Sequence, residues 1–174
     1  AKLEYYNPTG SLKDRILVRM VEAAEQRGEL KPGMTIIEGT TGNTGIATSM
    51  VAAVKGYRCV IVMPRGMSIE RRKLDLAYGA ELVLTEGAES DVDLVLDKVN
   101  EMMAAEPGVY WKVGQFENPD NSLAHYQTTG PEIWEQTDGQ VDAVVLSQGT
   151  GGTITGVGRY LRERKQSVKL YAVE

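Results

Sequence analysis

The stretch TIIEGTTGNTGIATSMVAAVKG (Thr35–Gly56) passes from a short apolar strand, expected at 35–38, through a glycine-rich turn into a helix, expected at about 45–55. Gly56 follows the helical run and is typical of a helix end. The alternation continues along the chain, with strands expected at 1–6, 59–63, 81–85, 142–147 and 169–174 and helices at 69–78, 90–105, 122–136 and 153–164. Such alternation is typical of parallel sheets with helices on both faces, so the sequence predicts an α/β fold.

The composition favours a globular protein without nucleic-acid or membrane contacts. The chain has 174 residues, 42% of them hydrophobic, which suits one domain or two small ones. A net charge of -5, with Lys and Arg scattered among acids, argues against a nucleic-acid partner. The apolar runs are too short to span a bilayer and no apolar leader opens the chain, so we expect a soluble, cytoplasmic protein. Cys59 is the only cysteine and is expected to be buried in a strand.

Two glycine-rich turns lie where a predicted strand gives way to a helix, which is where ligands bind in α/β sheets. GTGGT (Gly149–Thr153) combines glycines, which let the backbone approach an anion, with helix-start amides and threonine hydroxyls. We interpret it as a phosphate-binding turn; a purely structural turn is the alternative. GTTGNTG (Gly39–Gly45) gathers short polar side chains beside a helix start, which suits a carboxylate, although Asn and Thr also cap helices for local reasons.

Lys13 lies in the run NPTGSLKDR (Asn7–Arg15), where a helix with an apolar face is expected to begin. Ser11 as the N-cap and Asp14 three residues later predict a capping box. The helix dipole disfavours a charged lysine in the first turn, whereas an amine that attacks a carbonyl gains from a lowered pKa. Lys13 is therefore a candidate nucleophile, and an ordinary solvated lysine is the alternative.

Nucleotide-binding patterns fit GTGGT less well. No Gly-Lys-Ser/Thr follows, which argues against a nucleotide triphosphatase. Gly149 and Gly151 match the first two glycines of the dinucleotide fingerprint and Glu174 stands near the expected ribose-binding acid, but Ile154 replaces the third glycine. A nicotinamide-dependent oxidoreductase is thus a distant alternative. His125, the only histidine, is expected to be structural because no metal-ligand partners accompany it, and no metal site is predicted.

Six motifs, taken in order, resemble those of the fold type II pyridoxal-phosphate enzymes. The resemblance is closest to the cysteine synthase (O-acetylserine sulfhydrylase) and cystathionine β-synthase family, and it covers essentially the whole chain. The motifs are NPTGSLKDR, GTTGNTG, MSIERR, QFENPDN, HYQTTGPEIW and GTGGTITGVGRYL. The resemblance implies a tryptophan synthase β-like fold, pyridoxal 5′-phosphate as cofactor and a homodimer.

The resemblance also implies a role for individual residues. Lys13 would be the Schiff-base lysine, serving as nucleophile, base and acid in turn. Asn43 would donate a hydrogen bond to the 3-hydroxyl oxygen of the cofactor. The phosphate would be held by Gly149, Thr150, Gly151, Gly152 and Thr153. The α-carboxylate of the substrate would be received by Thr40, Thr41, Gly42, Thr44 and Gln115.

The implied reaction is a β-replacement on O-acetylserine or serine, in which sulfide or a thiol adds and cysteine is made. Two alternatives stay open: a condensation of serine with homocysteine, as in cystathionine β-synthases, and a core that binds the cofactor without turnover. By the same resemblance, residues 1–32 and 115–174 would belong to a larger cofactor-binding domain. Residues 33–114 would form a smaller, mobile substrate-binding domain.

The chain departs from the family pattern in two ways. The first turn usually begins Pro-Thr-Ser; here Gly39 replaces the proline and Thr41 the serine, and the added methyl group is expected to crowd the substrate carboxylate. Family members also extend beyond both ends of this sequence, so the chain resembles a truncated form. The part that follows Glu174 normally supplies the hydroxyl partner of the pyridine nitrogen, which puts the catalytic competence of this chain in question.

Overall fold

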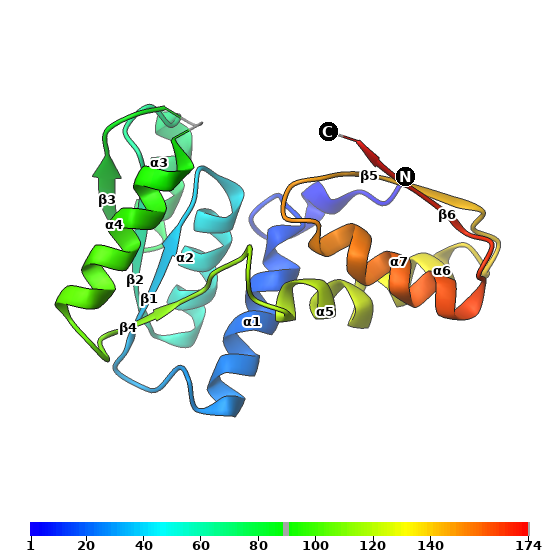
Figure 1. Cartoon of the computed structure of the whole chain (residues 1–174), viewed down its shortest axis with the longest axis horizontal. Helices are drawn as coiled ribbons and strands as arrows, with labels where there is room; N and C mark the ends of the chain where they lie inside the picture. Colours follow the sequence, from blue (N-terminus) through cyan, green and yellow to red (C-terminus); the bar gives the residue numbers. More distant parts are fainter. Residues whose placement is uncertain (89–90, 174) are drawn as a thin grey trace. The chain divides into compact units, whose positions relative to one another are not determined.

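The structure of the chain is a computed structural model that describes residues 1–88 and 91–173 (Figure 1). It contains two compact units. Residues 4–114 form the first unit, and residues 1–3 together with 115–174 form the second. Each unit contains a parallel sheet and helices, so the α/β class predicted from the sequence is confirmed. The predicted assignment of 1–32 with 115–174 to a larger domain and of 33–114 to a mobile one stays a prediction.

The first unit has a four-stranded parallel sheet in the order β3-β2-β1-β4. Its strands are β1 (Thr35–Gly39), β2 (Arg58–Pro64), β3 (Glu81–Thr85) and β4 (Tyr110–Lys112). Its helices are α1 (Lys13–Arg27), α2 (Asn43–Lys55), α3 (Ile69–Ala77) and α4 (Val92–Ala105), preceded by the 3-10 helix η1 (Glu4–Tyr6). In the central strand, Ile37 stands opposite Val60 of β2, and Ile36 stands opposite Trp111 of β4.

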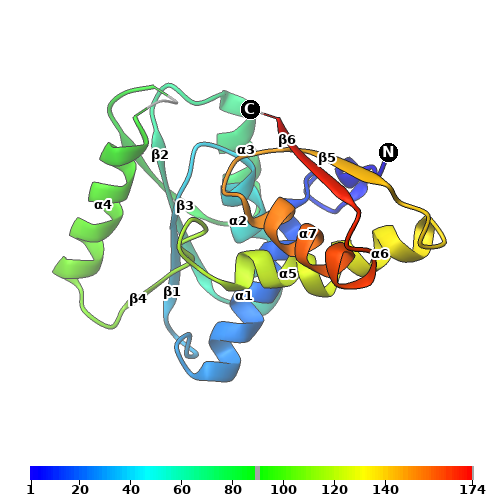
Figure 2. The same ribbon diagram turned by 45° about the vertical axis from the view of Figure 1, so that its right-hand side comes forward.

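Helices cover both faces of this sheet (Figure 2). On one face, Val95 and Val99 of α4 pack on Ile37, Val60 and Val62, and all five side chains are buried. On the other face lies α2, with α1 and α3 beside it. Burying an aliphatic side chain of this size stabilises the fold by roughly 1.5–3 kcal/mol, so this layer fixes the ends of the strands from which the polar turns leave.

The second unit is built on two parallel strands, β5 (Ala143–Ser147) and β6 (Lys169–Val173), joined through α7 (Gly152–Arg164). Helices α5 (Asp120–Gln127) and α6 (Thr129–Gln136) pack on α7. Val157 and Leu161 of α7 are fully buried in a core with Val141 and Val168. Val145 and Tyr171, on the strands, are 64% and 50% exposed.

Several predicted elements need correction. Residues 1–6 are not a strand, because the Asn7 side chain donates to the Glu4 carbonyl and closes the turn of η1. The single helix expected at 122–136 is two helices: Pro131 lacks the N–H that would continue the ladder, and the Thr128 hydroxyl donates to the Ala124 carbonyl. Strand β4 was not predicted, being only three residues long.

Two predictions reach beyond the described residues. The helix expected at 90–105 begins at Val92 in the structure, and Ser90 lies outside the described residues. The last strand ends at Val173, and Glu174 likewise lies outside them. Within residues 1–88 and 91–173, no helix is long and apolar enough to cross a membrane.

Candidate active site

Lys13 is the first residue of α1, in agreement with the predicted helix start. The side chain is half-buried, and this burial lowers the pKa of the amine, while the nearby Glu38 carboxylate acts in the opposite direction. A lowered pKa increases the fraction of neutral amine, which is the form that attacks a carbonyl. Burial therefore increases the fraction of neutral Lys13 amine, and the nucleophilic role of Lys13 stays a prediction.

The loop before Lys13 is held differently from the predicted capping box. The residue before the helix is Leu12, and the Ser11 Oγ accepts the Lys13 N–H at 3.1 Å. The buried Asp14 carboxylate does not cap Ser11; it accepts the Thr9 N–H at 2.8 Å and the Thr9 hydroxyl. The capping-box prediction is wrong because Gly10, with φ of 81°, turns the chain so that Thr9 faces Asp14. These bonds fix the backbone at Lys13.

The first glycine-rich turn joins β1 to α2, as predicted. Thr40 and Thr44 are buried, and Asn43 is exposed at the first position of α2. The Thr40 Oγ1 accepts the Gly42 N–H at 3.1 Å. A Cβ at Gly45 would lie 2.9 Å from Thr40 Cγ2, so the turn and the helix start approach each other too closely for a side chain there.

Two charged residues near this turn were not identified from the sequence. Arg71, at the start of α3, donates from Nη1 to the Thr41 carbonyl at 3.0 Å and lies against Gly42. Glu38 is 2% exposed and accepts the Gly114 N–H at 2.9 Å. An acid at the end of an otherwise apolar strand was a signal for Glu38. Arg71 lies inside the MSIERR motif, but its target is 30 residues away in sequence.

The second glycine-rich turn joins β5 to α7 in the second unit. Gly151 has φ of 79°, a conformation that favours glycine. The Thr150 Oγ1 accepts the Gly152 N–H at 3.3 Å. Asn121 donates through Nδ2 to Thr150 Oγ1 at 2.9 Å and to the Gln115 carbonyl at 2.8 Å, and a Cβ at Gly152 would overlap its Oδ1. Asn121 thus ties the predicted phosphate turn to Gln115, and sequence reasoning missed it.

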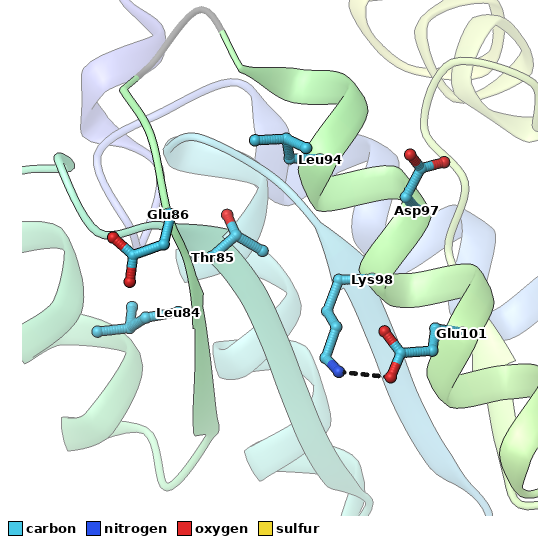
Figure 3. A pocket seen from close by; sticks show the side chains of 7 residues that line it. All are labelled: Leu84, Thr85, Glu86, Leu94, Asp97, Lys98 and Glu101. Carbon is cyan, nitrogen blue, oxygen red and sulfur yellow. Dashed lines mark hydrogen bonds and ion pairs between the residues drawn. The ribbon is translucent and has the colours of Figure 1, made fainter.

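The predicted residues fall into two sets, one in each unit. The first unit carries Lys13, Thr40, Thr41, Gly42, Asn43 and Thr44. The second carries Gln115, Gly149, Thr150, Gly151, Gly152 and Thr153. A pocket of about 330 Å³ also opens between the end of β3 and α4, beside the Lys98–Glu101 ion pair at 2.8 Å (Figure 3). None of the predicted residues lines that pocket, so it is not part of the candidate site.

The family described as "Pyridoxal-phosphate dependent enzyme" matches residues 1–174. The chain belongs to this family. Among curated relatives, cysteine synthase B of Escherichia coli (strain K12) is 51% identical over 176 residues, covering 99% of this chain and 56% of the relative. Cysteine synthase 3 of Caenorhabditis elegans is 48% identical over 174 residues, covering 99% and 51%. The chain spans about half the length of the curated relatives it matches.

Two solved structures have the same fold as this chain. A hydrogen sulfide-producing enzyme of Fusobacterium nucleatum has a TM-score of 0.94 at 43% identity, covering 99% of this chain and 56% of its own. A cysteine synthase of Entamoeba histolytica has a TM-score of 0.94 at 50% identity, covering 99% and 51%. The predicted resemblance to fold type II enzymes is confirmed, and the family match decides against the nicotinamide-dependent alternative.

Cys59, also in the first unit, is 6% exposed in β2, as predicted. Burial raises the pKa of its thiol to about 12, and its Sγ lies 4.0 Å from the Ser49 Oγ. A thiol with so high a pKa is not a nucleophile at neutral pH, so Cys59 does not belong to the candidate site.

Proposed function

We propose that the chain belongs to a pyridoxal-phosphate-dependent enzyme that makes cysteine by exchanging the β-substituent of O-acetylserine or serine for sulfide. The observation that carries this proposal is the 51% identity to cysteine synthase B over 99% of the chain. The relatives named cysteine synthase also support an amino acid and a sulfide or thiol as substrates. A cytoplasmic homodimer remains the expected state of the protein.

The residues present fit pyridoxal 5′-phosphate. Backbone amides at the start of α7, with the glycines of GTGGT, offer a set of donors suited to a phosphate. Lys13 offers a half-buried amine of lowered pKa for the aldehyde, and Asn43 offers an exposed amide for the ring hydroxyl. When bound, the cofactor supplies an electron sink for the α-carbon of the amino acid. Lys13 would attack the aldehyde of the cofactor, take the α-proton of the amino acid substrate and later return a proton.

The first turn would bind the substrate's α-carboxylate. The start of α2 offers hydroxyl and backbone amide groups from Thr40, Thr41, Gly42 and Thr44, and Gln115 would add a side-chain amide. Arg71 would keep the backbone of the turn in place through the Thr41 carbonyl. We further propose that residues 33–114 move as the smaller, substrate-binding domain and residues 1–32 with 115–174 stay with the cofactor.

The test has two steps on the purified 174-residue chain. The first is a titration with pyridoxal 5′-phosphate followed by visible absorbance, with Lys13→Ala as the control that should lose the lysine-dependent band. The second is an assay of cysteine formed from O-acetylserine and sulfide, run in parallel with serine and homocysteine. Cysteine from the first pair supports the proposal. Cofactor binding with no product from either pair would leave a cofactor-binding core without turnover and refute the proposed activity.

A second candidate is release of sulfide, because one of the two solved structures with a TM-score of 0.94 is a hydrogen sulfide-producing enzyme. The same residues would serve this reaction, in which the Cβ–S bond of cysteine breaks, sulfide leaves and water adds at Cβ to give serine. Incubating the chain with cysteine in the absence of added sulfide and measuring hydrogen sulfide distinguishes the two.

A further inference from the structure

Two hydrogen-bond networks contact the threonine side chains of the GTGGT turn in the second unit. Asn121 of α5 contacts Thr150, and His125, one turn later on the same helix, contacts Thr153. Asn121 is 5% exposed and His125 is 1% exposed. The mechanism proposed above uses neither residue.

The direction of the Asn121 bond is determined by its second partner. Its Nδ2 also lies 2.8 Å from the Gln115 carbonyl, which can only accept, so Nδ2 is the donor to both atoms. The Thr150 oxygen therefore accepts from Asn121 and from the Gly152 N–H. With both lone pairs occupied, the Thr150 hydroxyl proton is left to be donated elsewhere.

The His125 ring sits between two hydroxyls. Its Nδ1 lies 2.8 Å from Thr129 Oγ1 and its Nε2 lies 3.2 Å from Thr153 Oγ1. A neutral imidazole has one donor and one acceptor nitrogen, so it can donate to one of these hydroxyls and accept from the other. If Nε2 carries the proton, the Thr153 oxygen accepts it, and the Thr153 proton becomes available to another acceptor.

Close packing keeps the ring in this place. A Cβ at Gly156 would lie 2.7 Å from His125 Cβ and would overlap the Ser122 carbonyl, so α5 and α7 touch directly at this glycine. Thr153 lies one turn before Gly156 on α7. The imidazole is therefore held facing the first turn of α7, and the N–H groups of a helix start favour an anion.

We propose that Asn121 and His125 are positioning residues that set the Thr150 and Thr153 hydroxyls as proton donors to the phosphate group bound at the GTGGT turn. The Thr129 hydroxyl donates to Nδ1 and so selects the tautomer in which Nε2–H donates to Thr153. The inference rests on the proposed function, because it requires that this turn holds the cofactor's phosphate. His125 would act through Thr153 and would not react with the substrate.

The test compares two replacements of His125 in the full chain. Gln places an amide nitrogen near the Nε2 position and can still donate to Thr153, whereas Asn reaches only the Nδ1 position and can serve only Thr129. His125→Asn and Thr153→Val should each weaken pyridoxal 5′-phosphate binding by roughly tenfold or more, as expected for a lost hydrogen bond to a charged group. His125→Gln should stay within about threefold of wild type on the same scale.

Three controls separate positioning from structure. Thr155→Val, at an exposed site on the same helix, should bind like wild type. Pyridoxal, which lacks the phosphate, should bind all variants alike. The double variant His125→Asn/Thr153→Val should bind no more weakly than Thr153→Val, because His125 acts through Thr153. The ³¹P shift of the bound phosphate should change in Thr153→Val and Asn121→Asp and remain unchanged in Thr155→Val.

Each outcome decides one point. Equal losses in His125→Asn and His125→Gln, or the same losses with pyridoxal, would overturn the positioning role. If His125→Asn does not fold, the Thr153→Val and Asn121→Asp variants provide the test. Unchanged affinity for pyridoxal 5′-phosphate in both variants would overturn the positioning role. A wild-type chain that does not bind pyridoxal 5′-phosphate would instead refute the proposed function, and the positioning role with it.

Discussion

Replacing Asp75 with asparagine should stabilise the chain at neutral pH and leave its stability unchanged in acid. Asp75 is fully buried on α3, and burial raises the pKa of its carboxyl from 3.8 to about 6. Its Oδ2 has no hydrogen-bond partner among the described residues. A buried carboxylate without a compensating charge is costly, and protonation removes that cost.

The Ser49 hydroxyl opposes part of the effect of burial on Asp75. The Ser49 Oγ donates to Asp75 Oδ1 at 2.9 Å and also lies 3.0 Å from the Gly45 carbonyl, so its single proton is shared between two acceptors. A hydrogen bond donated to the ionised carboxyl lowers its pKa, but burial is the larger effect and the net shift is upward. The asparagine Oδ1 can accept the same bond without carrying a charge, so Asp75→Asn reproduces the neutral state at every pH.

The sign and size of the effect follow from the pKa. Because the folded-state pKa lies above the unfolded value, the folded chain binds the proton more tightly. Stability is therefore fully present below pH 3.8 and is lost as the pH rises through about 6. A difference of one pH unit in pKa corresponds to about 1.4 kcal/mol, so the loss for Asp75 is about 3 kcal/mol. Above pH 7 the variant should exceed the wild type by up to about that amount.

The assay is urea unfolding between pH 3.5 and 8, chosen to bracket about two units around the expected transition. The sequence has two tryptophans, so Trp111 in β4 reports on the first unit alone in a Trp134→Phe background. Ser49→Ala is the matched control. The Ser49 hydroxyl lowers the pKa of Asp75, so its removal should move the loss of stability to a higher pH. A stability difference between Asp75→Asn and wild type that does not change with pH would refute the reasoning.

Three further predictions address the candidate site. Borohydride reduction with bound pyridoxal 5′-phosphate, followed by peptide mapping, should place the pyridoxyl group on Lys13, and label on Lys55 or Lys112 would contradict the assignment. Gly152→Ala should destabilise the second unit by about 1–3 kcal/mol, because its Cβ would overlap Asn121; thermal unfolding checks this, and an unchanged melting temperature would count against it. Thr44→Val should weaken O-acetylserine binding by roughly tenfold in a spectral titration without altering the absorbance of the bound cofactor. Equal affinities would place the carboxylate elsewhere.

The local pattern of the sequence was enough to predict most of the fold. Strands β1, β2 and β3 were found within a residue of the predicted ends because buried parallel strands are short apolar runs between turn signals. The failures occurred where side-chain hydrogen bonds override the pattern. Asn7 closes the turn of η1, and Thr128 with Pro131 divides one expected helix into α5 and α6.

The candidate site was predictable only where its residues share a motif. The two glycine-rich turns were visible as continuous stretches, whereas the groups that hold them come from distant segments. Ser49 and Asp75 are 26 residues apart, Asn121 and Thr150 are 29 apart, and His125 and Thr153 are 28 apart. Nothing in a window of sequence couples such pairs, so a buried polar partner can be assigned only once the helices are packed.

The three helix starts that carry predicted site residues share one feature. At α1 the Ser11 oxygen accepts the Lys13 N–H, at α2 the Thr40 oxygen accepts the Gly42 N–H, and at α7 the Thr150 oxygen accepts the Gly152 N–H. In each case the hydroxyl binds the N–H two residues later, in place of the capping box that the sequence suggested for α1. An oxygen that accepts a backbone N–H directs its own proton away from that N–H. The same short pattern, a hydroxyl residue two or three positions before the first helical residue, therefore fixes the backbone and presents a donor. This explains why a turn that looks like a local cap in sequence can also bind an anion.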